Sequence, residues 1–383
     1  MRPLAYAVVL LCCAILAFTG CADLPKPPAE ASARRTPFTA IPGWTTAPLA
    51  PGLRAFVAGC ARIAASSALQ RTCEAARALP ADDEAAARRF VEDNFDAWAL
   101  AGADGKVEGM VTGYYEPVVA GSRVRSDRFR LPVYGVPADL VAVELESVQP
   151  ELKGLRLRGR LEGRRLVPYW TRAEIESRGA LDAPILAWVE DPVELFFLQI
   201  QGSGQIALEE GGKRGERLRL GYADQNGHPY RAIGRVLVEQ RELTLEQASM
   251  QGIKAWAAAN PHKLRAVLDA NPSYVFFREV PADAGSGPVG TLGAPLTAGY
   301  SLAVDPRHVP LGAPVFLATT WPGSTQPLER LMAAQDTGGA IRGAVRADFF
   351  WGSGEEAGAL AGRMRQRGRL WILWPRNEAL PKP

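Results

Sequence analysis

The chain has 383 residues, of which 47% are hydrophobic and 22% charged, a composition typical of a soluble globular protein. Its formal net charge is only +3 and its charges are scattered, so no run resembles the basic patch of a nucleic-acid-binding protein. The three histidines, His228, His262 and His308, show no His-x-x-x-His spacing, which argues against a zinc hydrolase.

Residues 1–20 have the pattern of a secretory signal peptide, in which Arg2 precedes a continuous apolar run that ends in small residues. This run is too short to favour a stable membrane span. Its end, FTGC, resembles the lipobox of bacterial lipoproteins, whose cysteine (here Cys21) is lipidated and becomes the first mature residue. Phe18 departs from the usual leucine, so a plain signal peptide that is cut nearby is the alternative interpretation.

Residues 21–43 are rich in proline and suit a tether between a membrane and a folded domain. Alanine rather than aspartate follows Cys21, and resemblance to the lipoprotein sorting rule then implies the outer membrane. We therefore expect a lipid-anchored protein on the periplasmic face of the outer membrane of a Gram-negative bacterium.

Two further cysteines, Cys60 and Cys73, remain in the mature chain as an even pair. An oxidising compartment permits a disulfide between them. The alternative is that both are buried thiols on neighbouring helices.

Residues 52–98 are predicted to be helical, because apolar residues recur there at helical spacing. From about residue 107 the chain consists of short β-branched or aromatic runs separated by turn residues, including the run 193–208, which predicts a barrel or sandwich. Helices return at 244–270, opened by the capping-box pattern of Thr244 and Gln247. The remainder is strand-rich, apart from a helix expected from Glu355 to Arg367.

This order of elements predicts a mainly β protein with a helical scaffold. We expect a large domain formed by residues 44–110 and 236–383, which contains helices and a β-barrel. An inserted β-rich domain, residues 111–235, interrupts it. Two β units joined by helices favour a ligand groove between them.

Three aspartates lie at predicted strand edges: Asp305, Asp336 and Asp348. Aspartate commonly ends a strand or caps a turn, and this interpretation is favoured for Asp305, which precedes a proline. Asp336 either stabilises the following Thr-Gly-Gly turn or orients a partner.

Asp348 precedes Phe349, Phe350 and Trp351, which leaves two interpretations open. If the aromatic rings cover its carboxyl group, burial raises its pKa and keeps the acid form available for general acid catalysis. If the rings point into the core, the carboxyl group faces water. Local sequence does not decide between them.

The segments QDTGGAIRGAVRADFFWGSGEEAG and SLAVDPRHVPLG together resemble the three-aspartate domain of the MltA family, the membrane-bound lytic murein transglycosylases A. Four other segments agree with this family in the same order: VTGYYEPVV, FFLQIQGSGQI, GHPYRAIGRVL and NPSYVFF. The resemblance covers nearly the whole mature chain, from about residue 107 to 374. Members of the family are lipoproteins, which agrees with the N-terminal pattern.

The resemblance implies a double-psi β-barrel that carries the three aspartates, a second, inserted β-barrel domain, and glycan bound in the groove between them. Asp348 matches the family's catalytic acid, and Asp336 and Asp305 match its two supporting aspartates. The implied substrate is the peptidoglycan strand. The implied reaction cleaves the β-1,4 bond between N-acetylmuramic acid and N-acetylglucosamine and forms a 1,6-anhydro sugar. No metal or cofactor is expected.

Further residues are predicted to bind the glycan. Tyr114 and Tyr115 combine ring faces with hydroxyl groups, although neighbouring strand residues point to opposite faces and only one of them is expected to line the groove. Gln201 and Ser203 lie beside glycines that allow a ligand to approach the backbone, and Thr112 is grouped with them. The alternative for each is ordinary barrel packing or turn formation.

Two other functions compete with the transglycosylase. One is a non-catalytic, peptidoglycan-binding outer-membrane lipoprotein, which has no need of a desolvated acid. The other is a metal-dependent hydrolase, for which three aspartates without histidine are weak support. The expected partners are peptidoglycan glycan strands, the outer membrane through the lipid anchor, and proteins of cell-wall synthesis or hydrolysis, with no nucleic acid.

Overall fold

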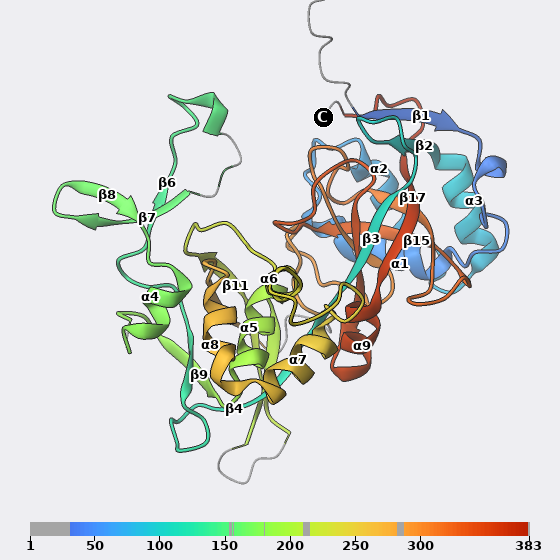
Figure 1. Cartoon of the computed structure of the whole chain (residues 1–383). Coiled ribbons are helices and arrows are strands. Elements are labelled where there is room, and N and C mark those ends of the chain that lie inside the picture. The colour runs from blue at the N-terminus through green and yellow to red at the C-terminus, as the bar shows by residue number, and fades with distance from the viewer. Residues whose placement is uncertain are drawn as a thin grey trace, which may run out of the picture. The chain divides into compact units, whose positions relative to one another are not determined.

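The computed structural model describes residues 31–152, 155, 157–179, 181–209, 215–281 and 287–381. The predicted signal peptide and Cys21 lie outside these residues. Within them the fold is mainly β, with sheets of eight, six and three strands (Figure 1). No helix in these ranges combines the length and apolarity needed to cross a bilayer.

The eight-stranded sheet closes on itself, because its strand β17 also pairs with its other edge strand, β3. The ring runs β3–β17–β14–β15–β13–β16 and back to β3, and it contains two parallel pairs, β3–β16 and β13–β15. This closed ring is the predicted double-psi β-barrel. Its strands are β3 (Gly109–Glu116), β13 (Ser301–Val304), β14 (Pro314–Thr320), β15 (Pro327–Asp336), β16 (Ala347–Ser353) and β17 (Arg365–Pro375).

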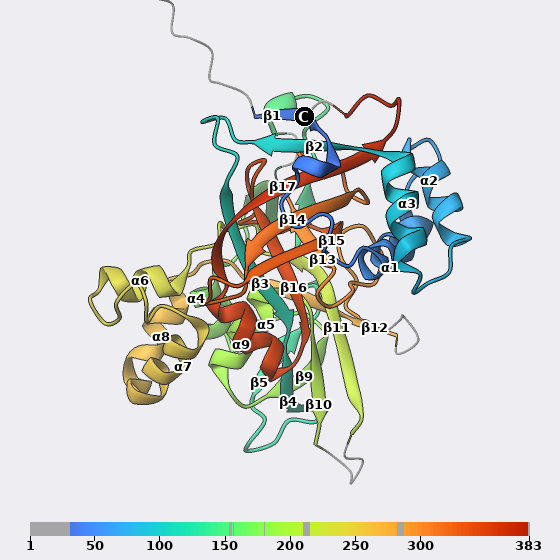
Figure 2. The same cartoon turned by 90° about the vertical axis from the view of Figure 1, so that its right-hand side faces the viewer.

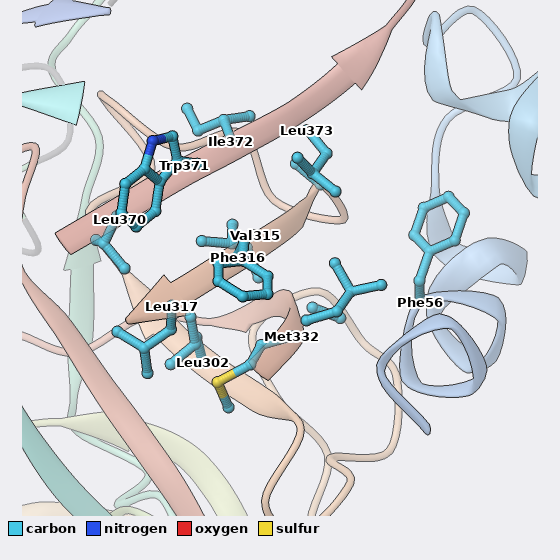
Figure 3. Packing of buried hydrophobic residues seen from close by; sticks show 14 of the residues in the cluster. Phe56, Leu302, Val315, Phe316, Leu317, Met332, Leu370, Trp371, Ile372 and Leu373 are labelled. Carbon is cyan, nitrogen blue, oxygen red and sulfur yellow. The ribbon is translucent and has the colours of Figure 1, made fainter. Parts of the chain in front are cut away.

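Two more strands and three helices cover the barrel. β1 (Ser32–Thr36) pairs with β2 (Phe95–Ala101), which pairs with β17. The helices are α1 (Ala50–Gly59), α2 (Leu69–Arg77) and α3 (Glu84–Asn94). Figure 3 shows Phe56 on α1 to one side of the barrel strands that carry Phe316 and Met332, and all three residues belong to one buried cluster. Residues 52–98 were predicted to be helical, but the helices end at Asn94. Phe95 begins β2, which pairs with β17 of the barrel.

A disulfide bond joins Cys60, just after α1, to Cys73 in α2. Both residues are almost completely buried in the cluster that packs α1 and α2 against the barrel. The bond closes a short loop between two helices whose apolar faces are already held by the barrel.

The six-stranded sheet has the order β12-β11-β10-β4-β9-β5. Tyr134 of its edge strand β5 and Phe276 of its other edge strand β12 belong to one buried cluster, together with Tyr169 and Tyr274. This sheet corresponds to the predicted second, inserted β-barrel, although no ladder joins β5 to β12 among the described residues. Its strands are β4 (Val118–Ser122), β5 (Leu131–Tyr134), β9 (Ile185–Val189), β10 (Gly204–Leu208), β11 (Arg217–Gln225) and β12 (Val275–Val280).

The three-stranded sheet lies between β5 and β9 in the chain. Its strands are β6 (Val141–Val143), β7 (Leu157–Glu162) and β8 (Arg165–Pro168). The short helix α4 (Arg172–Ser177) follows it, capped by Thr171 in a complete capping box with Glu174.

The run 193–208 was predicted to be a strand, and this is wrong for its first half, which is the helix α5 (Pro192–Gln201). The Asp191 carboxylate accepts hydrogen bonds from the backbone N–H groups of Val193 and Glu194, and Pro192 occupies the first turn. Gly202, with φ 75°, ends the helix. These end signals outweigh the β propensity of the aromatic and β-branched residues between them.

Helices α6 (Ile233–Glu239), α7 (Met250–Ala259) and α8 (Pro261–Asp269) pack together with α5 in one buried cluster (Figure 2). The capping-box pattern of Thr244 and Gln247 forms both of its hydrogen bonds, but the helix starts later, where Ser249 caps it. Sequence patterns did not predict α6. The last helix, α9 (Glu355–Arg363), ends four residues before its predicted end because β17 begins at Arg365.

The end of the inserted domain at residue 235 stays a prediction. The ladder between β11 and β12 favours an end after β12, because these strands pair along most of their length. The start of the insert at residue 111 also stays a prediction, because β3 (Gly109–Glu116) pairs with β16 of the barrel as far as Glu116 and β4 begins only at Val118.

The disulfide yields a prediction about stability. Replacing both cysteines, Cys60→Ala and Cys73→Ala, should lower the free energy of unfolding by about 3 kcal/mol, because the unfolded chain loses a loop constraint. Urea denaturation measures this difference. A reductant added to the denaturation series should lower the stability of the wild type and leave the double variant unchanged. An equal response of both proteins would contradict the prediction.

Candidate active site

Asp336 and Asp348 lie on one face of the barrel because of strand register. Asp348 on β16 is opposite Ala303 of β13, and the same alanine is opposite Asp336 of β15. On its other side, Asp348 is opposite Thr112 of β3. Residues that are directly opposite in a ladder project to the same face. Four strands therefore bring Asp336, Asp348 and Thr112 together.

The carboxyl group of Asp348 is held by the Thr112 hydroxyl, whose Oγ1 lies 2.6 Å from the carboxyl Oδ1 and donates to it. Arg346 in turn donates from a terminal nitrogen to the same Thr112 Oγ1, at 2.8 Å. Among the residues that the structure describes, no hydrogen bond reaches the second oxygen of Asp348, Oδ2. The side chain is half-buried, so this oxygen is the part of the acid that a substrate can meet.

Burial raises the pKa of Asp348 above its ordinary value. The Thr112 hydrogen bond and the positive charge of Arg346 act in the opposite direction, and the negative charge of Asp336 adds to the rise. A raised pKa keeps a carboxyl group protonated closer to neutral pH, as a general acid requires.

The aromatic residues after Asp348 divide between the two faces of β16. Phe349 is buried in the barrel core. Phe350 packs against Tyr114, with ring centroids 5.2 Å apart, on the face of the strand that carries Asp348. Phe349 therefore points into the core, as one alternative expected, and Phe350 lies on the side of the acid, as the other expected. The apolar surroundings of Asp348 come from Phe350 and Tyr114.

Asp336 has hydrogen-bond donors on both oxygens. Its Oδ1 accepts from the backbone N–H and the hydroxyl of Thr291, each at 2.9 Å. Its Oδ2 accepts from the Tyr114 hydroxyl at 3.1 Å. Burial raises the pKa of Asp336, although the Thr291, Thr337 and Tyr114 hydrogen bonds lower it. The structure places this carboxyl group as an anchor for Tyr114 and for the loop that contains Thr291.

Tyr114 and Tyr115 point in opposite directions, as their positions in one strand require. Tyr114 faces Asp336 and Asp348, and burial together with both carboxylates raises its pKa well above the ordinary value, so it stays a hydroxyl donor. Tyr115 is 5% exposed, and its hydroxyl lies 3.3 Å from the sulfur of Met250. Tyr115 thus packs between helices, which leaves Tyr114 as the tyrosine on the face of the acids.

Asp305 follows β13 and is completely buried. Its carboxylate accepts two hydrogen bonds from the Arg307 guanidinium, at 3.0 and 2.6 Å, and one from the backbone N–H of Gly343 at 2.7 Å. Burial alone would raise the pKa of Asp305, but these hydrogen bonds and the Arg307 charge lower it below its ordinary value. Asp305 therefore stays ionised and ties the loop before β16 to the end of β13.

Gln201 and Ser203 lie where α5 leads into β10. The Gln201 side-chain oxygen accepts from the backbone N–H of Tyr115, at 3.2 Å, so Gln201 links α5 to β3. Ser203 is half-buried beside Gly202. Neither makes a hydrogen bond to the aspartates among the described residues.

Sequence reasoning missed Arg346, Thr291 and the role of Glu116. Glu116 is buried and its carboxylate accepts from Gln205 of β10 at 2.7 Å and from Ser353 of β16, so it links the two large sheets. Thr291 lies 45 residues from Asp336 in the chain, and no local pattern signals their contact. Of these three residues, only Arg346 has a signal in the local sequence, because it is a basic residue two positions before Asp348.

Comparison with known proteins identifies the family. A family model described as the MltA specific insert domain matches residues 110–278, and one described as the 3D domain matches residues 300–374. The membrane-bound lytic murein transglycosylase A of Escherichia coli (strain K12) is 33% identical over 293 residues, which are 75% of this chain and 71% of that protein. This chain belongs to the MltA family.

Solved structures of MltA proteins share the fold. The crystal structure of MltA from Neisseria gonorrhoeae, in a monoclinic form, is 42% identical with a TM-score of 0.79, covering 93% of this chain and 97% of that one. The structure of E. coli MltA with bound chitohexaose is 30% identical with a TM-score of 0.66, covering 86% and 91%. These matches confirm the predicted MltA family and its fold class.

Asp305 generates a prediction about pH. Because its pKa is lowered in the folded protein, its charge stabilises the fold above the ordinary pKa of an aspartate, and this contribution is lost as the pH falls through the folded value. Asp305→Asn should lower the free energy of unfolding by about 2 kcal/mol at neutral pH. The difference from the wild type should shrink as the pH falls below about 4.

Urea denaturation at several pH values measures this effect. Asp82→Asn is the matched control, because Asp82 also pairs with an arginine, Arg54, but its side chain is 88% exposed. The control should change stability little at any pH. A constant difference between wild type and Asp305→Asn across the whole pH range would contradict the prediction.

Proposed function

We propose that Asp348 is the single acid–base catalyst with which this protein, a lytic transglycosylase, cleaves the β-1,4 bond between N-acetylmuramic acid and N-acetylglucosamine in peptidoglycan. The observation that carries this role is the environment of its carboxyl group, which burial holds toward the acid form while Oδ2 is left without a protein partner among the described residues. A proton on that oxygen is available to a glycosidic oxygen.

One acid is sufficient for a reaction that uses no water. Asp348 donates its proton to the leaving glycosidic oxygen as the bond to the muramoyl C1 breaks. The muramoyl C6 hydroxyl then attacks C1, and its proton passes to the Asp348 carboxylate. The products are a 1,6-anhydro sugar and a new glycan end, and the acid is regenerated. Ordinary glycosidases need a second carboxylate to activate water or to attack the sugar.

The surroundings of Asp336 argue against a two-carboxylate hydrolase. Asp336 and Asp348 are separated by one strand, which puts their backbones roughly 10 Å apart. However, Thr291 and Tyr114 occupy both oxygens of Asp336 with donors. A carboxylate whose lone pairs already accept these bonds is a poor base for water, so we assign Asp336 a supporting role.

Tyr114 is the residue that we propose for glycan contact beside the acid. Its ring lies against Phe350 and its hydroxyl is fixed by Asp336, so the ring is presented in one orientation. Fixed aromatic rings suit the apolar faces of sugars. Gln201 and Ser203 are proposed to bind sugars of the glycan strand that lie farther from Asp348, on the side of the six-stranded sheet.

Digestion of purified peptidoglycan by the signal-free protein tests this function. We expect anhydro-muropeptides in the wild-type digest, with or without a chelator, because no step requires a metal ion. Asp348→Asn should lower the rate by a factor on the order of 10² to 10⁴, because the general acid is lost. Mass spectrometry of the products measures both effects.

Asp336→Asn serves as the comparison variant and should lose less activity than Asp348→Asn. Products with ordinary reducing ends would show hydrolysis and contradict the one-acid mechanism. Intact glycan together with measurable binding would instead favour the non-catalytic lipoprotein.

We also propose that the protein is anchored to the periplasmic face of the outer membrane by lipid on Cys21. The lipobox-like sequence at residues 18–21 and the proline-rich segment after it support this location. The relatives from E. coli and Vibrio cholerae are both called membrane-bound. Proteins of cell-wall synthesis or hydrolysis remain the proposed protein partners.

Cys21→Ala tests the anchor. The wild type should be found in the outer-membrane fraction and incorporate labelled fatty acid, and the variant should lose the label. Cys13→Ala is the matched control, because this cysteine lies in the predicted signal peptide and should not affect the mature protein. Labelling that persists in Cys21→Ala would refute the assignment of the lipidated cysteine.

A further inference from the structure

We infer that Thr112 and Arg346 are positioning residues that hold Oδ1 of Asp348 as a hydrogen-bond acceptor and so reserve Oδ2 for the catalytic proton. This inference rests on the proposed function of Asp348 and adds to it the atom that carries the proton. It assigns to Thr112 a role other than the glycan contact predicted from its sequence position, and a role to Arg346, which no sequence pattern singled out.

The hydrogen bonds form a directed chain. A guanidinium group has only donors, so Arg346 must donate to Thr112 Oγ1 across their 2.8 Å contact. The single hydroxyl proton of Thr112 then remains for the 2.6 Å contact with Asp348 Oδ1. Within the described ranges the Thr112 hydroxyl has no other acceptor, so Oδ1 receives a hydrogen bond and is the less favourable site for the acid's own proton.

Arg346 is itself held in place by the two strands that it serves. Its guanidinium donates to the backbone carbonyl of Met110 on β3 and to that of Ala347 on β16. Thr112 and Asp348 follow these residues by two positions and one position on the same strands. The position of the Arg346 guanidinium, and with it the hydrogen bond to Thr112, therefore depends on the register between β3 and β16.

This arrangement matters for both proton transfers. The proton that leaves Oδ2 goes to the glycosidic oxygen, and the proton of the C6 hydroxyl returns to the same atom. Oδ1 keeps its hydrogen bond from Thr112 throughout. The acid thus needs no rotation of its carboxyl group between the two steps, and one oxygen faces the substrate in both.

The groups that face Asp348 come from each strand around it. Arg346 comes from the residue just before β16, Asp336 from β15 and Tyr114 from β3, whereas β13 contributes the uncharged Ala303. Arg365 of β17 lies opposite Thr112 and is exposed. Of the three charged or titratable groups nearest the acid, only Arg346 favours the carboxylate form, and it acts together with the Thr112 hydrogen bond.

The test measures the rate of anhydro-muropeptide release from soluble glycan strands, at low substrate concentration, between about pH 4 and 9. The alkaline limb of this profile reports the pKa of the free enzyme's acid. Thr112→Val removes a hydrogen bond that favours the carboxylate, so the acid holds its proton to higher pH. The limb should shift upward by about one pH unit, and the rate at the optimum should fall about tenfold.

Thr112→Ser keeps the hydroxyl, so the alkaline limb of its pH–rate profile should lie at the same pH as that of the wild type. Arg346→Met should shift the limb upward as well, because it removes a positive charge and frees the Thr112 hydroxyl to turn. Arg367→Met is the matched control, since Arg367 also donates to a backbone carbonyl beside β3, that of Glu108, without touching Thr112.

A limb that stays in place in Thr112→Val while KM rises would show that Thr112 only contacts glycan and would overturn the inference. A Thr112→Ser variant that behaves like Thr112→Val would also overturn it. Failure of the proposed function is distinguishable, because the wild type would then release no anhydro-muropeptides at any pH.

Discussion

The paired strand β3 is the element on which the rest of the structure depends. Its antiparallel ladder with β17 and its parallel ladder with β16 close the barrel, which would otherwise present two unpaired edges. The same parallel ladder sets Thr112 opposite Asp348 and Tyr114 opposite Phe350. Closure of the barrel and assembly of the acid's surroundings therefore rest on one set of backbone hydrogen bonds. After Pro117 the chain continues into β4, so this strand also begins the second sheet.

The three aspartates show how hydrogen-bond donors set the ionisation state and the role of a carboxyl group. Asp305 accepts from a guanidinium and a backbone N–H and stays a carboxylate. Asp336 accepts on both oxygens and holds Tyr114. Asp348 accepts on one oxygen only, and burial favours its neutral form. The number and charge of the donors distinguish these carboxyl groups, although all three lie at strand ends or edges of one barrel.

The family, the fold class and the three aspartates were predictable from sequence, because long segments of the chain match the patterns of the family and contain these aspartates. The helix-end signals Asp191, Pro192 and Gly202 are also present in the sequence, but the aromatic run 193–198 between them has the composition of a strand. The contacts of Thr112 and Thr291 were not predictable, since ladders between distant segments create them. Which tyrosine faces the acids follows from strand alternation only after the barrel interior is known.

The sequence distance between the parts of the site has a consequence for the living cell. Thr112 and Asp348 are 236 residues apart in the chain, and the parallel ladder between β3 and β16 brings them together. A partly synthesised or partly folded chain lacks the partner that orients its acid. An enzyme that cuts the cell wall is harmful in the wrong place, and the pairing of β3 with β16 is the step that brings Thr112 to Asp348.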